Sequence, residues 1–340
     1  MEKPVLKNMT IDEMKTFFAE IGEKPFRGQQ VFEWIYKGAD SFEAMRNLPK
    51  SLQVKLAQTT EFQNIRTVTV QQSKTDGTRK YLFEMPDGEK IETVFMKYRY
   101  GNSICISSQA GCAMGCRFCA SAIGGLKRNL ESWEMAAQIL AAEKYTGERI
   151  SHIVIMGTGE PFHNYENVAR FLRLANSPKG LNISMRNITV STCGLTDGIR
   201  RFAADFPQAT LAISLHAPAD ELRSRMMPVN DRYPVKEVIA AAREYAQTTG
   251  RRVTFEYALV KDINDSMEHA DMLAALLRGI LCHVNLIPLN EVKETDLAGA
   301  DRKHAEDFRT RLEQRGIPAT VRRELGSDID AACGQLRNKK

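Results

Sequence analysis

The stretch GCAMGCRFCAS, residues 111–121, gathers three of the chain's seven cysteines into one short loop. Cys112, Cys116 and Cys119 have the spacing C-x3-C-x2-C, and no fourth ligand follows at the distances typical of a zinc finger. A cuboidal iron–sulfur cluster held by three thiolates leaves one iron with an open position, and a loop with flexible glycines can wrap such a cluster. The spacing therefore favours an iron–sulfur cluster. A zinc site, or a thioredoxin-like pair formed by Cys116 and Cys119, is the alternative.

From residue 103 onward, strand-like runs alternate with helix-like runs. The expected strands are 103–108, 152–157, 186–191, 210–215, 252–259 and 283–288, and the expected helices include 132–145, 164–176, 235–247, 266–279 and 302–316. This alternation predicts an α/β fold in which helices cover a parallel sheet. Six units are too few for a closed eightfold barrel, so we expect an open, partial (β/α)6 barrel, to which residues 319–325 could add a last strand.

A smaller unit precedes this barrel. Helices are expected at 10–22, with Thr10 as the N-cap, at 27–38 and at 41–58. The runs 67–70, 79–85 and 90–96 alternate like strands and are separated by two Asp-Gly pairs, which are strong hairpin signals. The sequence therefore predicts a helical module followed by a β-hairpin extension.

Polar and sulfur-bearing residues follow the ends of the expected barrel strands. In parallel β/α arrays the active site lies at these carboxyl ends. The cysteine loop follows the first strand, and the later strands are followed by Gly159 and Glu160 in GTGEP, Ser191 in STCG, Ser214, Leu215 and His216 in SLH, and Asn290 in PLN. Each of these residues, taken alone, reads as an ordinary turn or a local cap. Their convergence on one edge of the sheet predicts a common site there.

Composition limits the class of protein. The chain has 340 residues, 43% of them hydrophobic and 26% charged, as in globular proteins, and its longest apolar runs are far too short for a membrane span. The N-terminal stretch has no apolar segment typical of a signal peptide, so we expect a cytoplasmic protein whose cysteines bind metal or react. A net charge of +5 permits a nucleic-acid partner without requiring one.

The cysteine spacing resembles the loop of the radical SAM superfamily. In that superfamily the open iron of a [4Fe-4S] cluster is chelated by S-adenosylmethionine (SAM), which is then cleaved to a 5′-deoxyadenosyl radical. The resemblance implies that Cys112, Cys116 and Cys119 bind the cluster and that SAM supplies the missing ligand. Its partial barrel agrees with the alternation of strands and helices, and its glycine-rich edge that receives the methionyl amine matches Gly159 and Glu160.

The closer resemblance is to the RlmN family of 23S rRNA and tRNA adenine-carbon-2 methyltransferases, and it covers nearly the whole chain. It rests on long words: CISSQAGCAMGCRFCAS, LKRNL, IVIMGTGEP, ISLHAP, MPVNDRY, NDSMEHA, HVNLIPLN and DIDAACGQL. The resemblance implies that SAM is contacted by the following residues: Gly159, Glu160, Ser191, Ser214, Leu215, His216 and Asn290. It also implies that Glu92 accepts a proton, that Cys333 carries the methyl group and that Cys105 is the second catalytic cysteine. Taken alone, Cys105 reads as a small strand residue and Glu92 as an exposed strand glutamate.

The implied mechanism uses two SAM molecules per turnover, because carbon 2 of adenine is too electron-poor to attack a methyl group directly. Cys333 takes a methyl from the first by displacement. The radical made from the second removes hydrogen from that S-methyl group, and the carbon radical adds to carbon 2. Loss of the ring proton to Glu92 and attack of Cys105 on the Cys333 sulfur then release the methylated RNA and leave a disulfide, which a reducing cytosol resets.

The resemblance also implies partners and a division of the chain. We expect 23S rRNA near the peptidyl-transferase centre and some tRNAs as substrates, a reductant such as flavodoxin or ferredoxin, and a monomer. We expect residues 1–62 to form an accessory module for RNA binding, 63–100 the β-hairpin extension, 101–318 the radical SAM core and 319–340 the segment that carries Cys333. Basic groups that could bind phosphates are Lys24 and Arg27 near Trp34, Lys127 with Arg128, and Arg322 with Arg323.

Two other functions are open at this point. One is a Cfr-like methyltransferase that modifies carbon 8 of the same rRNA adenosine. The other is a cluster- or zinc-containing RNA-binding module without catalysis, for which zinc without labile sulfide would be the signature.

Overall fold

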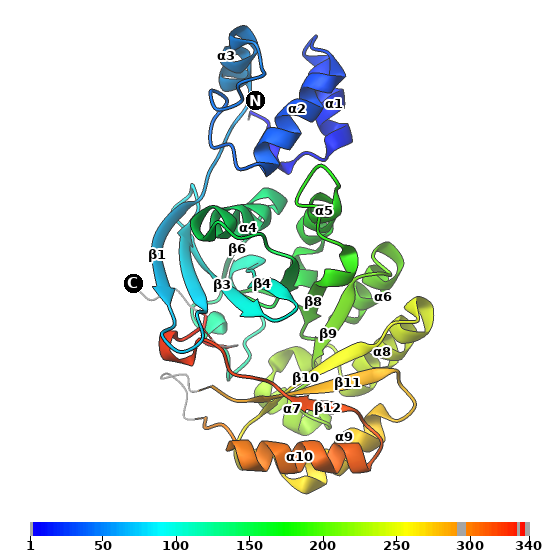
Figure 1. Ribbon diagram of the computed structural model, residues 1–340. Coiled ribbons are helices and arrows are strands. Elements are labelled where there is room, and N and C mark those ends of the chain that lie inside the picture. The colour runs from blue at the N-terminus through cyan, green and yellow to red at the C-terminus, as the bar shows by residue number, and fades with distance from the viewer. Residues whose placement is uncertain (1–2, 291–296, 332–333, 337–340) are drawn as a thin grey trace.

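The computed structural model describes residues 3–290, 297–331 and 334–336. It contains a ten-stranded sheet and a separate two-stranded sheet (Figure 1). The strands are β1 (Arg66–Gln72), β2 (Arg79–Glu84), β3 (Lys90–Tyr98), β4 (Gly101–Cys105), β5 (Gln109–Gly111), β6 (Leu126–Asn129), β7 (His152–Ile155), β8 (Ile188–Thr192), β9 (Thr210–Ser214), β10 (Val253–Leu259), β11 (Cys282–Pro288) and β12 (Ala319–Val321). The helices are α1 (Ile11–Glu20), α2 (Pro25–Tyr36), α3 (Lys50–Thr59), α4 (Ser132–Thr146), α5 (Tyr165–Asn176), α6 (Thr196–Asp205), α7 (Asp220–Met226), α8 (Val235–Thr249), α9 (Met267–Leu277) and α10 (Arg302–Gln314). No helix in the described ranges is long and apolar enough to cross a membrane.

The predicted partial barrel is confirmed. The strands β4, β7, β8, β9, β10 and β11 are parallel neighbours in that order, and β12 adds a seventh parallel strand beside β11. Helices follow these strands and cover one face of the sheet (Figure 1). Two of these helices, α6 and α7, and the short hairpin of β5 with β6 were not among the expected elements.

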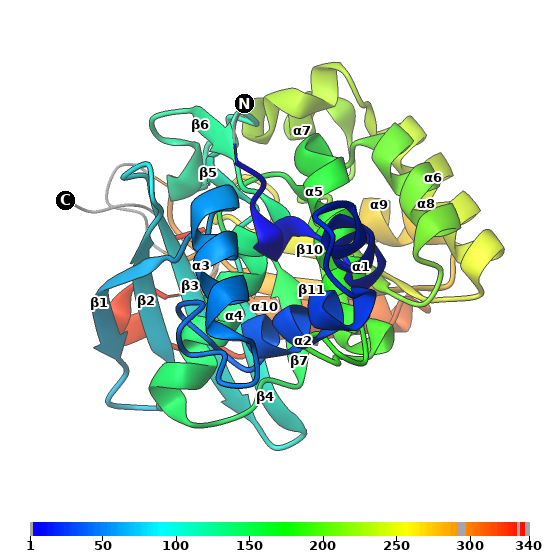
Figure 2. The same ribbon diagram turned by 90° about the horizontal axis from the view of Figure 1, so that it is seen from above.

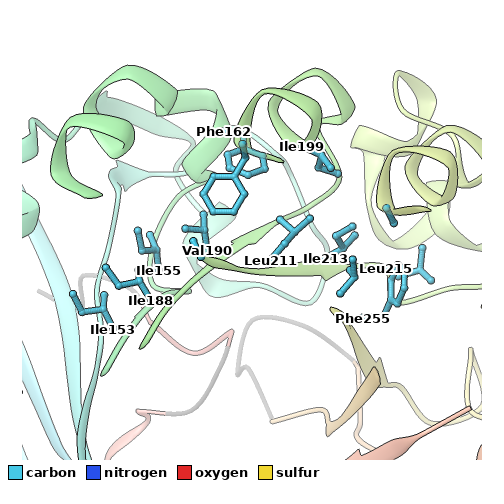
Figure 3. Close-up of a cluster of buried hydrophobic side chains, with 14 of the residues drawn as sticks. Ile153, Ile155, Phe162, Ile188, Val190, Ile199, Leu211, Ile213, Leu215 and Phe255 are labelled. Atoms are coloured by element: carbon cyan, nitrogen blue, oxygen red, sulfur yellow. The ribbon is translucent and has the colours of Figure 1, made fainter. Parts of the chain in front are cut away.

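The main core lies between the parallel strands and the helices. Aliphatic side chains at alternate strand positions point toward the helices, as Figure 3 shows for residues of β7, β8 and β9: Ile153, Ile155, Ile188, Val190, Leu211 and Ile213. Because side chains alternate across a strand, the residues between them face the inside of the barrel. These inward positions include Ser191, Ser214 and Glu256, so the packing of the core places polar groups on the concave face.

The N-terminal helices pack as a separate apolar cluster. A capping box starts α1, in which Thr10 and Glu13 satisfy each other's backbone N–H groups. The helix expected at 41–58 begins only at Lys50, so the predicted start was wrong. Pro49 is the N-cap residue, because a proline inside a helix would remove a hydrogen bond and clash with the preceding turn.

An antiparallel extension joins the helices to the barrel. The strands β1, β2 and β3 pair antiparallel, and β3 continues the sheet by pairing antiparallel with β4. Both expected Asp-Gly turns are present, with Gly77 and Gly88 at positive φ. The pairing places Val94 of β3 directly opposite Cys105 of β4.

The C-terminal strap, residues 322–336, of which 332–333 lie outside the described ranges, connects the two edges of the ten-stranded sheet. It leaves β12 at one edge and reaches the turn between β1 and β2 at the other (Figure 1). There the Gly326 amide donates to Asp76 Oδ2 at 2.8 Å, and Asp328 Oδ2 accepts from the Lys74 amide at 3.0 Å. The strap therefore crosses the open side of the partial barrel.

The helices α1, α2 and α3 lie over α4 and α5 in both views (Figures 1 and 2). Asn8 holds this contact at the start of α4. Its Nδ2 donates to Glu131 Oε2 at 2.6 Å, and its Oδ1 accepts from Ser132 Oγ at 2.8 Å and from the Trp133 amide at 3.1 Å. One asparagine side chain thus caps α4 from the N-terminal module.

Asn8→Ala should lower the free energy of unfolding by about 1–2 kcal/mol, because it removes three hydrogen bonds and leaves the Trp133 amide of α4 without this acceptor. The midpoint of urea unfolding measures the loss. Asn187→Ala is the matched control, since among the described residues its side chain makes one hydrogen bond, from Nδ2 to the Ser151 carbonyl at 3.2 Å. An equal loss in both variants would contradict the capping role of Asn8.

Candidate active site

A cavity of about 160 Å³ opens at the carboxyl ends of the parallel strands. Its walls come from the loops after β5, β7, β8, β9 and β11. Of the predicted site residues, the following line it together: Cys112, Cys116, Cys119, Gly159, Glu160, Ser191, Ser214, His216 and Asn290. We call it the cluster-loop cavity. The predicted convergence of strand-end residues is thus present in the fold.

The cysteine loop is enclosed by the hairpin of β5 and β6. A Cβ on Gly111 would lie 2.0 Å from the Gly125 carbonyl oxygen, and Gly111 has φ of +76°, so only glycine fits there. The Cys112 amide donates to that same carbonyl at 3.2 Å, and the Arg117 amide donates to the Met226 carbonyl at 3.0 Å. Backbone hydrogen bonds therefore fix the start and the middle of the loop.

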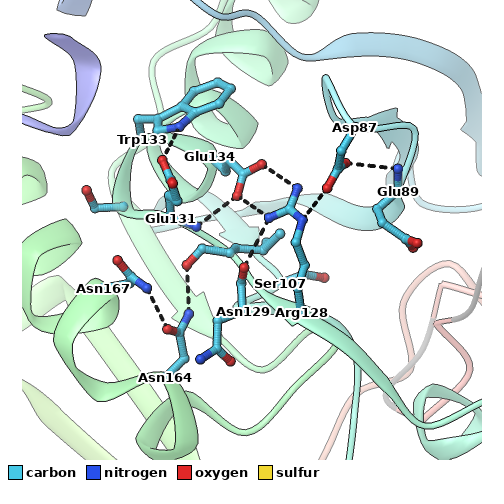
Figure 4. Close-up of polar contacts among 12 residues, drawn as sticks. Asp87, Glu89, Ser107, Arg128, Asn129, Glu131, Trp133, Glu134, Asn164 and Asn167 are labelled. Carbon is cyan, nitrogen blue, oxygen red and sulfur yellow. Dashed lines mark hydrogen bonds and ion pairs between the residues drawn. The ribbon is translucent and has the colours of Figure 1, made fainter. Parts of the chain in front are cut away.

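Arg128 holds the hairpin to the body of the protein (Figure 4). Its two terminal nitrogens each donate to Glu134 at 2.7 Å, and its Nε pairs with Asp87 in the turn between β2 and β3. Glu134 is buried, so this bidentate pair is stronger than an exposed one. The guanidinium expected to bind RNA phosphate is thus already engaged by two carboxylates.

The three loop cysteines fit a cluster better than a single ion. Burial raises the pKa of the Cys112 thiol to about 11 and that of Cys116 further, so a metal would have to replace their protons. Within the described ranges, no three His, Cys, Asp or Glu side chains are arranged to hold one metal ion. A cuboidal cluster binds each thiolate through a different iron, so it does not need the thiols to converge on one point.

Glu160 is a fully enclosed carboxylate at the edge of this cavity. Its Oε1 accepts from the Phe162 amide at 2.9 Å and its Oε2 from the Cys193 amide at 2.7 Å. Burial raises the pKa of Glu160, while these amides favour the charged form. The carboxylate is thus positioned by backbone groups and is suited to a cationic partner such as an ammonium group.

His216 has a defined tautomer. Its Nδ1 accepts from the Ala258 amide at 2.9 Å, so in the neutral ring the proton is on Nε2. Burial, with the nearby Arg223 charge, lowers the pKa of His216 to about 3. Its ring contacts Phe118 edge-on at 4.8 Å between centroids, which joins it to the cysteine loop. His216 therefore faces the cavity as a neutral group with one N–H donor.

His216 should make the protein less stable in acid. Its pKa is about 3 in the folded state and about 6.5 when unfolded, so below pH 6.5 the unfolded chain binds the extra proton. Relative to His216→Asn, the wild-type free energy of unfolding should fall by roughly 1 kcal/mol per pH unit between pH 6 and 4. Urea unfolding across this range measures the difference, and asparagine tolerates the positive φ of this position. Parallel pH curves for both proteins would contradict the buried neutral ring.

The remaining predicted SAM contacts differ in what they present. Gly159 has φ of +110°, and a Cβ there would lie 2.6 Å from Gln109, so the loop requires glycine. Ser191 and Ser214 present hydroxyl groups to the cavity, and Asn290 lines both this cavity and a neighbouring one. The side chain of Leu215 points into the hydrophobic core, so this residue can contact a ligand only through its backbone.

Arg223 was not predicted, and it organises the ends of β8 and β9. It is fully buried, and its guanidinium donates to four carbonyl oxygens and one side-chain oxygen: those of Leu215, Tyr233, Cys193, Ser214 and Asn230 Oδ1. These bonds fix the loops that carry Ser191 and His216. A single arginine within a polar stretch gives no sequence signal of burial, so only the fold reveals this residue.

Cys105 lies in a second cavity, between β3, β4 and the C-terminal strap. It packs with Val94 and Met96 of β3 and with Leu325 and Ala331 of the strap. This strap cavity and the cluster-loop cavity share four lining residues: Met156, Ile287, Asn290 and Arg322. The two cavities are therefore adjacent, and Arg322 borders both.

Glu92 lies on the same face of β3 as Val94. Its carboxylate pairs with Lys80 at 3.4 Å, and both side chains are about 8% exposed. Lys80 also donates to the Asp330 carbonyl of the strap at 3.1 Å. Glu92 is thus a buried, ion-paired carboxylate beneath the strap rather than an exposed one. Cys333, the expected methyl carrier, lies outside the described residues.

Comparisons with known proteins agree with this architecture. Residues 5–62 match the model of the ribosomal RNA large subunit methyltransferase N-terminal domain, and residues 106–273 match the radical SAM superfamily. The chain is 51% identical to a probable dual-specificity RNA methyltransferase RlmN of Lachnospira eligens, over 98% of this chain and 96% of the relative. It is 50% identical to the protein of the same description from Geobacillus kaustophilus, over 99% and 93%.

The fold is also similar to a solved structure. The crystal structure of a radical SAM methyltransferase from Sphaerobacter thermophilus superposes with a TM-score of 0.94 at 46% identity. The match covers 98% of this chain and 99% of that one. The likeness therefore includes the N-terminal helices, the barrel and the strap together.

Proposed function

This chain belongs to the RlmN family of radical SAM RNA methyltransferases, and from that membership we propose that it methylates carbon 2 of adenine in both 23S rRNA and tRNA. The dual specificity follows the description of the relatives. The structural observation that carries the proposal is the adjacency of two cavities, one lined by the cysteine loop and one by Cys105. A reaction that needs both a cluster and a pair of cysteines requires this adjacency.

The superfamily implies a [4Fe-4S] cluster and SAM. Cys112, Cys116 and Cys119 would hold the cluster, and Glu160 would receive the methionyl ammonium group of SAM. When bound, cluster and SAM supply a one-electron route to a carbon radical, which is the chemistry that an electron-poor ring carbon requires. His216 would donate its Nε2 proton in a hydrogen bond, and its low pKa keeps the ring from adding a positive charge beside a cationic ligand.

Cys333 carries the transferred carbon in this proposal. The described residues on either side of it support the assignment: Ala331 packs with Cys105, and Gly334 lines the cluster-loop cavity. The Gly334 carbonyl also accepts from the amide of Ala120, the residue after Cys119, at 2.8 Å. The described residues on either side of Cys333 therefore border both cavities, as expected for a carrier that meets the cofactor at one cavity and Cys105 at the other.

Cys105 and Glu92 complete the reaction. The Cys105 thiolate attacks the sulfur of alkylated Cys333, a disulfide forms between the two cysteines, and the bond from that sulfur to the RNA-borne carbon breaks with its electron pair on the carbon. That carbon takes up a proton and becomes the methyl group. Glu92 accepts the carbon-2 proton. Glu92 lies on the same face of β3 as Val94, and Val94 is paired with Cys105 of β4. Glu92 and Cys105 therefore both lie under the strap. Two SAM molecules are consumed for each methyl group delivered.

The partners follow from this chemistry. We propose that the N-terminal module holds the RNA. In this module the Arg27 guanidinium lies 4.9 Å from the centroid of the half-exposed Phe26 ring, and the two form a cation–π pair that could contact the RNA. A low-potential reductant of the flavodoxin or ferredoxin class would supply electrons. A reducing cytoplasm would reset the disulfide, and the enzyme would act as a monomer.

Mass spectrometry of nucleosides tests the proposal. Anaerobically reconstituted protein should convert adenosine in an unmodified 23S rRNA fragment, and in tRNA, to 2-methyladenosine when SAM and reductant are present. Formation of 8-methyladenosine would replace the proposal with the Cfr-like reaction. Modification of rRNA alone would remove the dual specificity.

A further inference from the structure

Glu256 is the one charged residue in the mostly apolar and aromatic strand β10, VTFEYAL. Its neighbours Phe255 and Tyr257 point into the core between sheet and helices. Because strand side chains alternate, Glu256 points into the barrel, where it lines the cluster-loop cavity and is only 5% exposed. The fold therefore directs a buried carboxylate into the cavity that we assign to SAM.

One oxygen of this carboxylate is bound and the other is not. Oε2 accepts from Asn285 Nδ2 at 2.7 Å. Among the described residues, none donates a hydrogen bond to Oε1, although the side chain lies in the cavity wall. Burial raises the pKa of Glu256, and the positive charge of Arg322 acts in the opposite direction. Oε1 is not itself enclosed, so it faces the open space of the cavity, where a donor group of a ligand could reach it.

The neighbours of Glu256 form a polar row. The register of the parallel strands sets Ser214 of β9 and Asn285 of β11 on either side of it. The row thus presents a hydroxyl, a carboxylate and an amide at one level of the barrel. Glu160 and the three loop cysteines line the same cavity from other loops, and Ala258 and Leu289 form apolar parts of its wall. Glu256 therefore belongs to a polar row on the strands, whereas Glu160 lines the cavity from a loop.

We propose that Glu256 binds the ribose hydroxyl groups of SAM through its free oxygen, an inference that rests on the proposed SAM site. A ribose offers two adjacent hydroxyl donors, and an ionised carboxylate offers only acceptors. Dinucleotide-binding folds use an acidic residue for the same group. The sulfonium centre carries no hydrogen-bond donor, and the edge of adenine needs a donor as well as an acceptor. The ribose is thus the part of SAM that matches this row.

The test compares two ligands that differ by one hydroxyl group. Binding of 5′-deoxyadenosine and of 2′,5′-dideoxyadenosine, each with methionine, is measured by anaerobic calorimetry on cluster-loaded protein. The wild type should prefer 5′-deoxyadenosine by at least about tenfold, as expected for a charge-assisted hydrogen bond in a buried site. Glu256→Ala should reduce that preference to about twofold or less, and Glu256→Gln should give an intermediate value.

An unchanged preference in Glu256→Ala, or no preference in the wild type, would overturn the inference. If the alanine variant does not load its cluster, the test relies on Glu256→Gln, which keeps the size of the side chain and removes its charge. A preference for 5′-deoxyadenosine equal to that of the wild type would then contradict the role of the carboxylate. Glu324→Gln is the matched control, because Glu324 borders the strap cavity and is absent from the wall of the cluster-loop cavity. No RNA is present, so a failure of RNA methylation leaves this result intact.

Discussion

Cys105→Ala should turn the enzyme into a protein that remains covalently attached to its RNA. Addition of the Cys333-borne carbon to adenine does not need the Cys105 thiol, whereas release does, because only a thiolate that reaches the Cys333 sulfur can displace the RNA. Methylated RNA should fall to near background, and an RNA–protein adduct should accumulate toward one per active chain. Denaturing gels of labelled RNA measure the adduct, and mass spectrometry measures the product.

A second buried cysteine provides the control. Cys282 lies on β11 in the core beneath the helices, and burial raises the pKa of its thiol to about 11. Cys282→Ala should leave turnover close to that of wild type and give no adduct. Normal release of methylated RNA by Cys105→Ala would show that another group breaks the link to Cys333.

Cys116→Ala should abolish the iron–sulfur cluster, while Cys193→Ala should keep it. Both cysteines line one cavity, Cys193 buried and Cys116 half-buried, and desolvation raises the pKa of both thiols. Cys193 is engaged through its backbone, with its amide bound to Glu160 and its carbonyl to Arg223, which suits a structural residue. Iron and sulfide should fall from roughly four each per chain to near zero in the first variant only.

Colorimetric iron and sulfide analysis after anaerobic reconstitution measures these contents. The formation of 5′-deoxyadenosine should disappear together with the cluster. Equal loss of iron in Cys116→Ala and Cys193→Ala would mean that Cys193 is a fourth ligand. The site would then be closed, and it would have no position for SAM.

The parallel barrel could be predicted because its strands and helices carry strong local signals. Strands buried on both faces read as apolar, β-branched runs, and HIVIMG and TLAISL coincide closely with β7 and β9. The helix α6 gave a weaker signal, since Gly198 interrupts it. That glycine packs against Phe162, where a Cβ would lie only 2.7 Å from the ring side chain, so a tertiary contact requires the residue that weakens the helix.

The candidate site was predictable only in part. The spacing of the three cysteines carries the cluster prediction by itself, whereas the roles of Cys105 and Glu92 came from the family resemblance and not from their local sequence. The local sequence of Glu92 is typical of an exposed glutamate because it does not show its ion pair with Lys80, which is made across paired strands and covered by a strap distant in sequence. The structural role of Arg223 is likewise visible only in the fold, where carbonyl oxygens of two loops accept hydrogen bonds from its guanidinium.

The stoichiometry of the reaction tests the central claim most directly. Anaerobic, cluster-loaded protein is incubated with SAM, reductant and unmodified RNA, and the three products are counted in the same sample. If a cluster and a methyl-carrying cysteine act together, each 2-methyladenosine should be accompanied by about one S-adenosylhomocysteine and at least one 5′-deoxyadenosine. Methylated RNA formed with S-adenosylhomocysteine but without 5′-deoxyadenosine would contradict the account.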